Sequence, residues 1–182
     1  MAKGLLLTDR ERPKYRGIRT FRDRHGRFQF RYPSDWHVFE LSDDRDGVMV
    51  SPEAQDPATY FCVWATRLQD AIVAEDLDVL REGVGEGLSQ LPGLSIESAS
   101  EDVLGNLVRL RRVYTFEQDG SIRRRKVWML YVYKWLFALV AQGANADEYE
   151  HWSMMLEDCF DDFDLAPALW FASDRELAKE LD

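Results

Sequence analysis

The sequence predicts an α+β fold, an α/β/α sandwich in which two main helices cover a mostly antiparallel meander sheet. This prediction rests on the spacing of apolar residues, which changes along the sequence. Apolar residues alternate in several segments, as in strands, but recur at steps of three and four over 76–91 and 147–163, as on one face of a helix. The connections between the later strands are only a few residues long, and such short connections force antiparallel pairing.

The first clear strand contains Phe28, Phe30 and Tyr32, which alternate and therefore share one face. Pro33 ends it because the proline nitrogen has no hydrogen to donate to a neighbouring strand. Further extended segments follow, each bounded by turn residues: 36–41, 48–50 and 59–68. The last of these is apolar on both faces, which predicts that both are at least partly covered.

The first helix is predicted over 76–91 and ends before Pro92-Gly93. Its apolar stripe consists of Leu77, Leu80, Val84, Leu88 and Leu91. Three glycines at 83, 85 and 87 lie inside it, at a cost of up to ~1 kcal/mol each relative to alanine. They lack the preceding strand and following lysine of a phosphate-binding loop, so we expect them to permit close packing of the helix on the sheet.

A meander and a second helix complete the predicted domain. The strands are expected over 94–103, 107–117, 126–133 and 136–142, with a turn at Gln118-Asp119-Gly120-Ser121. The stripe of the second helix, over 147–163, is Tyr149, Trp152, Leu156, Cys159, Phe160 and Phe163. Beyond it, Ser173 and Glu176 have capping-box spacing ahead of a short polar helix.

Length and charge define three regions: a basic N-terminal arm (1–19), one domain (20–164) and a C-terminal tail with a short helix (165–182). Residues 1–31 hold ten basic and three acidic side chains, whereas the remainder holds 13 basic and 30 acidic ones. Such an acidic body would repel a nucleic-acid backbone. No apolar run approaches the ~20 residues that span a bilayer, and no secretory signal is present, so we expect a cytoplasmic protein without membrane insertion.

Residues suited to catalysis or metal binding do not form a complete set. Asp147 and His151 are four apart on the second helix, but zinc takes three or four ligands. Ser42, Asp44, Asp46 and Glu53 match part of a calcium loop, yet strands flank them instead of helices, and an aspartate-rich turn is favoured. Cys62 and Cys159 are interpreted as core thiols. We therefore expect no metal, no cofactor and no enzymatic activity.

The order of elements, together with Tyr32-Pro33-Ser34-Asp35-Trp36 and Leu91-Pro92-Gly93, resembles the PsbP-like α/β/α sandwich family. That family includes the Ran-binding import factor of yeast and bacterial DcrB-type proteins. The resemblance covers roughly residues 20–164. It implies a non-enzymatic binding or assembly role, which is an analogy from fold.

The expected function is that of a cytoplasmic adaptor or chaperone-like protein acting through contacts with another protein. Association of two copies of this chain into a homodimer is an alternative. The candidate partner-binding residues are the cations of one predicted hairpin and two aromatic residues of the tail: Arg109, Arg111, Arg123, Arg124, Arg125, Lys126, Trp170 and Phe171. The hairpin cations could instead pair with neighbouring acids. Two other functions stay open, a carrier of a small apolar ligand in a cavity between helices and sheet, and a hydrolase.

A cluster of carboxylates at the end of the second helix has two interpretations. It comprises Glu157, Asp158, Asp161, Asp162 and Asp164. The cluster either serves solubility alone or forms a dock for a basic segment, for which residues 10–31 of this chain are the nearest candidate.

Overall fold

The computed structural model describes residues 10–42 and 44–172. These residues form ten strands: β1 (Ile18–Arg22), β2 (Phe28–Pro33), β3 (His37–Glu40), β4 (Asp46–Ser51), β5 (Tyr60–Arg67), β6 (Ser95–Leu104), β7 (Leu107–Gln118), β8 (Ser121–Val132), β9 (Trp135–Gly143) and β10 (Asp164–Leu165). The helices are the 3-10 turn η1 (Ala74–Asp76) and the α-helices α1 (Leu77–Ser89), α2 (Ala146–Asp161) and α3 (Pro167–Ala172).

The strands form two sheets, and within each sheet every pair of neighbouring strands is antiparallel. The larger sheet has the order β3-β4-β5-β9-β8-β7-β6, and the smaller has the order β1-β2-β10. The meander from β6 to β9 follows directly from its short connections, since each strand pairs with the next. The predicted α+β class with a mostly antiparallel sheet is confirmed.

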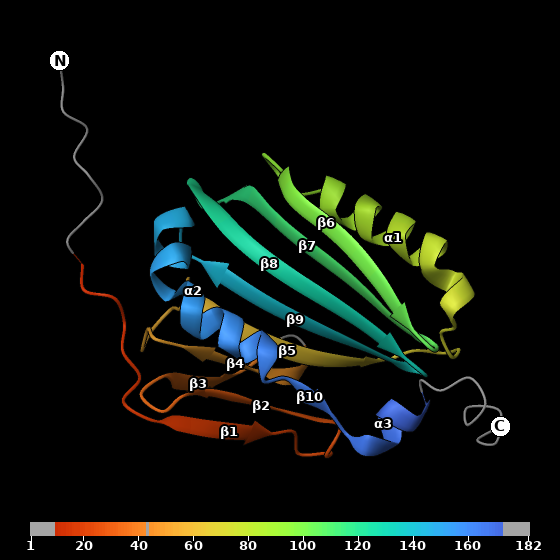
Figure 1. Ribbon diagram of the computed structural model, residues 1–182. Coiled ribbons are helices and arrows are strands. Elements are labelled where there is room, and N and C mark those ends of the chain that lie inside the picture. The colour runs from red at the N-terminus through yellow and green to blue at the C-terminus, as the bar shows by residue number, and fades with distance from the viewer. Residues whose placement is uncertain (1–9, 43, 173–182) are drawn as a thin grey trace.

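The two main helices lie on opposite faces of the larger sheet (Figure 1). On the α1 face, half-buried Leu80 and Val84 pack against the buried Val108 and Leu110 of β7. On the α2 face, Leu156 and Phe160 join the larger core, which also contains the inward residues of β2. The smaller sheet and α2 therefore share one side of the molecule, and α1 covers the other, as the sandwich prediction requires.

Aromatic rings fill the core on the α2 face. Phe28, Phe30 and Tyr32 of β2 are all buried, which confirms that they share one strand face. The ring of Phe61 lies 5.1 Å from that of Phe30 and 5.0 Å from that of Phe160, and both pairs are edge-to-face. This geometry is favourable for aromatic pairs beyond the apolar area they bury.

Three boundaries differ from the residue ranges read from the sequence. Strand β1 begins at Ile18, and β8 begins at Ser121 instead of 126. After α2, Leu165 pairs with Phe28 and is buried, so the tail contributes β10 and α3 to the described fold. Ser173 and Glu176, the predicted helix cap, lie outside the described residues.

The expectation that the three glycines of α1 permit close packing is wrong. A Cβ built on Gly83, Gly85 or Gly87 would meet nothing within 4 Å, and all three residues are exposed. Gly47 is the contrasting case, because a Cβ there would lie 1.9 Å from the carbonyl oxygen of Val63 on the neighbouring strand. The apolar stripe of α1 shows which residues face the sheet, but not how closely the helix backbone approaches it.

Replacing Gly83 or Gly87 with alanine is therefore expected to raise the free energy of unfolding by roughly 0.5–1 kcal/mol each, because alanine restricts the unfolded chain and meets no neighbour in the folded one. Urea unfolding followed by circular dichroism measures the change. Gly47→Ala is the matched control and is expected to destabilise the protein by about 1–3 kcal/mol through overpacking. Destabilisation by both helix substitutions would contradict the exposed placement of these glycines.

Candidate functional site

Part of the α2 face carries no helix of the described residues. Helix α2 packs on β2, β5, β8 and β9, and leaves β6 and β7 uncovered on this side (Figure 1). Uncovered sheet faces of soluble proteins normally carry polar residues, with the apolar residues on the covered face. The outward residues of these strands and of the adjoining β8 therefore decide what this surface binds.

The register of β7 and β8 divides the predicted basic patch between the two faces of the sheet. Arg109 lies opposite Leu130 and Arg111 lies opposite Trp128, so both are on the α2 face. By alternation along β8, Arg124 and Lys126 share that face, whereas Arg123 and Arg125 lie on the α1 face together with Arg112 of β7. The structure thus brings together four of the six predicted hairpin cations and separates the other two.

Two of the four cations of the α2 face contact Trp128, and a third, Arg111, lies opposite it on β7. The guanidinium carbon of Arg109 lies 4.8 Å from the centre of the indole ring, and the ammonium of Lys126 lies 5.5 Å from it. Both distances suit a cation–π attraction. Arg124 lies 4.7 Å from the ring centre of Tyr149 of α2, so the cations extend to the edge of the helix.

Acidic side chains pair with these cations. Arg109 donates two hydrogen bonds to Asp102 of β6, at 2.9 and 2.6 Å, and these bonds lower the pKa of that carboxyl. Arg124 lies 2.9 Å from Glu97, and Lys126 pairs with Glu157 of α2. The alternative reading, in which the hairpin cations pair with neighbouring acids, therefore describes Arg109, Arg124 and Lys126.

Two buried donors on this surface have no hydrogen-bond acceptor among the described residues. They are the indole nitrogen of Trp128 and Nε of Arg111. Arg111 is also the most loosely paired of the four cations, since its closest carboxylate oxygen, on Asp102, is 3.6 Å away. We call the group the Trp128 surface, and it consists of Trp128, the four cations and their acidic partners: Arg109, Arg111, Arg124, Lys126, Glu97, Asp102 and Glu157.

The predicted aromatic tail residues lie in α3. The indole nitrogen of Trp170 donates to Asp164 at 3.1 Å, and Trp170 is 41% exposed. Phe171 belongs to the same helix, but its side chain lies outside the described part of the structure. Helix α3 packs against β8.

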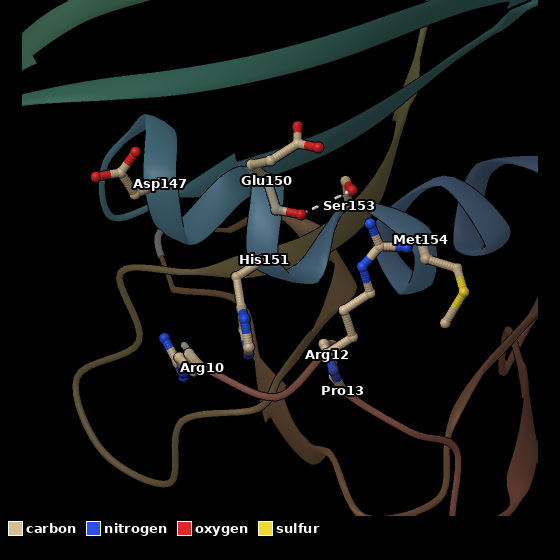
Figure 2. A pocket seen from close by; sticks show the side chains of 8 residues that line it. All are labelled: Arg10, Arg12, Pro13, Asp147, Glu150, His151, Ser153 and Met154. Atoms are coloured by element: carbon tan, nitrogen blue, oxygen red, sulfur yellow. Dashed lines mark hydrogen bonds between the residues drawn. The ribbon is translucent and has the colours of Figure 1, made fainter. Parts of the chain in front are cut away.

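Residues 10–17 lie along α2, as Figure 2 shows for Arg10, Arg12 and Pro13. Arg10 pairs with Glu148, and the hydroxyl of Tyr15 donates to Asp158. Farther along the chain, Arg31 lies 2.7 Å from Asp162. The acids of α2 thus receive cations and a hydroxyl from 10–31, the segment that the sequence indicated as the nearest basic candidate.

A pocket of about 340 Å³ opens between this arm and α2 (Figure 2). Asp147 and His151, considered as two metal ligands, both line it. Within the described residues, no group of three or more histidine, cysteine or acidic side chains could hold a metal ion. The partial calcium-loop residues are engaged elsewhere, since Asp46 pairs with Arg27 and Glu53 accepts from the backbone of Ala58 and Thr59.

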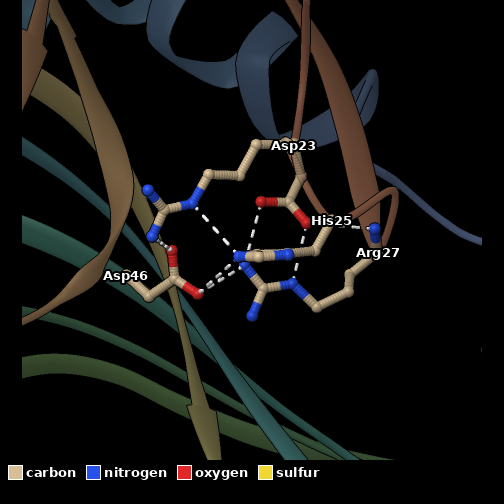
Figure 3. Close-up of polar contacts among 5 residues, drawn as sticks. Asp23, His25, Arg27 and Asp46 are labelled. Atoms are coloured by element: carbon tan, nitrogen blue, oxygen red, sulfur yellow. Dashed lines mark hydrogen bonds and ion pairs between the residues drawn. The ribbon is translucent and has the colours of Figure 1, made fainter.

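A compact ion-pair cluster joins the β1–β2 connection to the start of β4 (Figure 3). Arg27 donates to both oxygens of Asp23, at 2.7 and 2.9 Å, and lies 2.8 Å from Asp46. Arg24 contacts Asp46 at 3.1 Å and donates to His25. This cluster contains no hydroxyl or thiol of the described residues that could act as a nucleophile. Its ion pairs connect the smaller sheet to the larger one, and we call it the Arg27 clamp.

The two cysteines are buried and free, as the sequence indicated. Burial raises the pKa of the Cys62 thiol to about 12 and also raises that of Cys159. Both therefore stay protonated near neutral pH, whereas the thiolate is the nucleophilic form. None of the helices within the described residues is long and apolar enough to cross a membrane.

Comparison with known proteins gives matches in structure alone, because no family model and no curated protein sequence matches the chain. Cyanobacterial PsbP (CyanoP) from Synechocystis sp. PCC 6803 has a TM-score of 0.60 at 12% identity, over 81% of this chain and 92% of that one. LpqN, involved in cell envelope biogenesis of Mycobacterium tuberculosis, has a TM-score of 0.58 at 18% identity, over 82% and 92%.

The Ran-binding protein Mog1p of Saccharomyces cerevisiae is also similar, with a TM-score of 0.50 at 8% identity over 88% of this chain and 98% of that one. At these identities the similarity is one of fold, and fold alone does not define function. The chain has the PsbP-like fold, which confirms the resemblance seen in its motifs.

Proposed function

We propose that this protein is a non-enzymatic protein-binding module, and that its partner docks on the Trp128 surface. The partner presents carboxylates and carbonyl oxygens, because the surface holds one loosely paired cation, Arg111, and the indole nitrogen of Trp128. Arg and Trp are the residue types that most often carry the binding energy of protein interfaces. The yeast protein of similar fold is described as Ran-binding, which agrees in class with a protein-binding role.

The observation that carries this proposal is a pair of buried donors, on Trp128 and Arg111, that have no acceptor within residues 10–42 and 44–172. Buried polar groups are normally hydrogen-bonded, and each one left without a partner costs about 1–3 kcal/mol. Trp128 and Arg111 are directly opposite each other in the β7–β8 register. Both atoms are buried in the free protein, so a partner that supplies acceptors to them must also shift the side chains that cover them, and would then recover that cost.

A photo-cross-linking amino acid tests the surface directly. Ser100 of β6 is suitable for the replacement because it is exposed, small and opposite Arg111. The matched control position is Val79 on α1, which is 71% exposed on the other side of the sheet. We expect illumination in an extract of the source cells to join a recurrent protein to position 100 and not to position 79.

Charge reversal at Arg111 then decides the proposal. Arg111→Glu is expected to abolish the adduct at position 100 and to weaken the purified partner's binding by at least about tenfold, because it places like charges against the partner's carboxylates. Lys14→Glu changes the same charge on the exposed arm and is expected to leave binding unchanged. An adduct that survives Arg111→Glu, or one that forms equally from position 79, would contradict the proposed docking surface.

The alternative of a ligand carrier is less well supported. The apolar cavity between α1 and the sheet has a volume of about 140 Å³, whereas pockets for drug-sized ligands usually measure ~300–1,000 Å³. The cavity is therefore too small for the cargo of a typical carrier, and protein binding is the function that the geometry supports best.

A further inference from the structure

The cavity between α1 and the sheet is small, but its lining is chemically specific. It lies on the α1 face and so is separated from the Trp128 surface by the sheet. Apolar side chains form most of its wall: Trp64, Val84, Leu88, Leu110, Val127, Met129 and Val140. An engineered apolar cavity of about 150 Å³ takes up benzene, so a volume of this order suits a group of roughly six to eight heavy atoms.

The outer wall of the cavity is α1, which is weakly attached. None of its residues is buried, and the residues that it contributes to the cavity, Val84 and Leu88, are half-buried. The exposed Gly83, Gly85 and Gly87 lower its helix propensity by up to ~1 kcal/mol each. Elements with few buried apolar contacts open at low free energy. A ligand therefore has a route into the cavity past this helix.

Two arginines line the cavity, and their pairing differs. Arg112 lies 2.7 Å from Glu101 and also donates to backbone carbonyls, so its charge is compensated. Arg125 donates to the side-chain carbonyl of Gln142 and stacks 4.5 Å from the ring centre of Phe116. Within the described residues, its other hydrogen-bond partners are the hydroxyl groups of Tyr60 and Tyr114. It forms no ion pair with a carboxylate of the described residues.

Arg123 adds a second uncompensated charge on the same strand face. It lies two residues before Arg125 on β8 and donates to the carbonyl oxygen of Ala144 at 2.8 Å. Its Nε is buried and has no hydrogen-bond partner within residues 10–42 and 44–172. Fully buried cations are normally paired with acids, whereas Arg123 and Arg125 are half-buried. Arg125 lines the apolar cavity and Arg123 lies two residues before it, and neither pairs with an acid of the described residues, so a bound ligand could supply the counter-ion.

We propose that this cavity binds a small apolar carboxylate. The apolar chain of the ligand lies against Val84 and Leu88 of α1, and its carboxylate pairs with the guanidinium of Arg125. Arginine matches a carboxylate with two parallel hydrogen bonds, and such charge-assisted bonds are stronger than neutral ones. The inference goes beyond the proposed protein-binding role and is independent of it, since the two sites lie on opposite faces of the sheet.

A comparison of hexanoate with hexan-1-ol tests the proposal on the full chain. The two probes have the same apolar chain and differ in the charged head group. In a titration followed by nuclear magnetic resonance, hexanoate is expected to bind at least about tenfold more tightly than hexan-1-ol and to shift the signals of Trp64 and Val84. Arg125→Gln is expected to remove this preference while leaving the binding of hexan-1-ol unchanged.

A filled cavity provides the second arm of the test. Val84→Phe is expected to abolish binding of both probes, and Val79→Phe, on the exposed side of the same helix, is expected to change neither. Circular dichroism checks that each variant is folded, and if Val84→Phe is unfolded the Arg125→Gln comparison alone decides. Equal affinity of the wild type for hexanoate and hexan-1-ol, or a hexanoate preference that persists in Arg125→Gln, would overturn the proposal.

Discussion

Replacing Phe160 with alanine is expected to lower the free energy of unfolding by about 3–5 kcal/mol, the usual range for a buried phenylalanine. Phe160 is 1% exposed and lies between two other rings, at 5.0 Å from Phe61 and 4.9 Å from Trp128. Its removal leaves a cavity that the sheet and α2 fill only in part. Urea unfolding monitored by circular dichroism gives the change directly.

The same substitution links stability to the proposed site, because Phe160 supports Trp128 from beneath the Trp128 surface. We expect the fluorescence of the tryptophans to change in Phe160→Ala under conditions where the protein is still folded. Met154→Ala is the matched control, since Met154 lies on the same helix and is 52% exposed, and its effect should stay within about 0.5 kcal/mol. Equal losses for the two variants would contradict the placement of Phe160 in the core.

Replacing Arg27 with methionine is expected to destabilise the protein by about 3–5 kcal/mol, because it leaves the carboxylates of Asp23 and Asp46 without their main partner. Asp23 is 7% exposed and Arg27 is 8% exposed, so water replaces little of the lost interaction. Arg24→Met removes an exposed cation from the same cluster and should cost under about 1 kcal/mol. Calorimetric or urea unfolding of both variants distinguishes a buried clamp from a surface ion pair.

The clamp also predicts how stability depends on pH. Burial alone would raise the pKa of Asp23, but the hydrogen bonds from Arg27 outweigh it and lower the pKa below its ordinary value. A carboxyl whose folded pKa is depressed stabilises the fold above its unfolded pKa, and this contribution is lost as the pH falls toward the folded value. The wild type should therefore lose more stability below about pH 4 than Arg27→Met does. Parallel pH profiles for the two proteins would show that the pair contributes nothing in this range.

The sequence predicted the elements whose pattern is strong and local. Alternating aromatics identified β2, and the stripe from Tyr149 to Phe160 identified α2. The first half of β8 was missed because Arg123–Lys126 looks like a solvated run of charge. It is a strand because it pairs with β7 and β9, and the register brings its cations near acids such as Glu97 and Glu157. Strand β10 has two residues, too few to show any period.

The candidate site was predicted in composition but not in geometry. The sequence indicated the hairpin cations, yet it could not show that alternation sends Arg111 and Arg125 to opposite faces of the sheet. It also gave no sign that Trp128 lies beside Arg109, Arg111 and Lys126, since a tryptophan in a strand is most simply a core residue. Which donors lack an acceptor is a property of the assembled sheets, so no local pattern records it.

The central pairing of β5 with β9 has a consequence for the speed of folding. Phe61 lies opposite Ala141, whereas the hairpins from β6 to β9 join residues that are close in sequence. Contacts between distant residues require a long loop to close before any stabilisation is gained, and domains dominated by such contacts fold in about milliseconds to seconds. The β6–β9 meander is thus the part of the chain that can form early, and the seven-stranded sheet is completed only when β5 arrives beside β9.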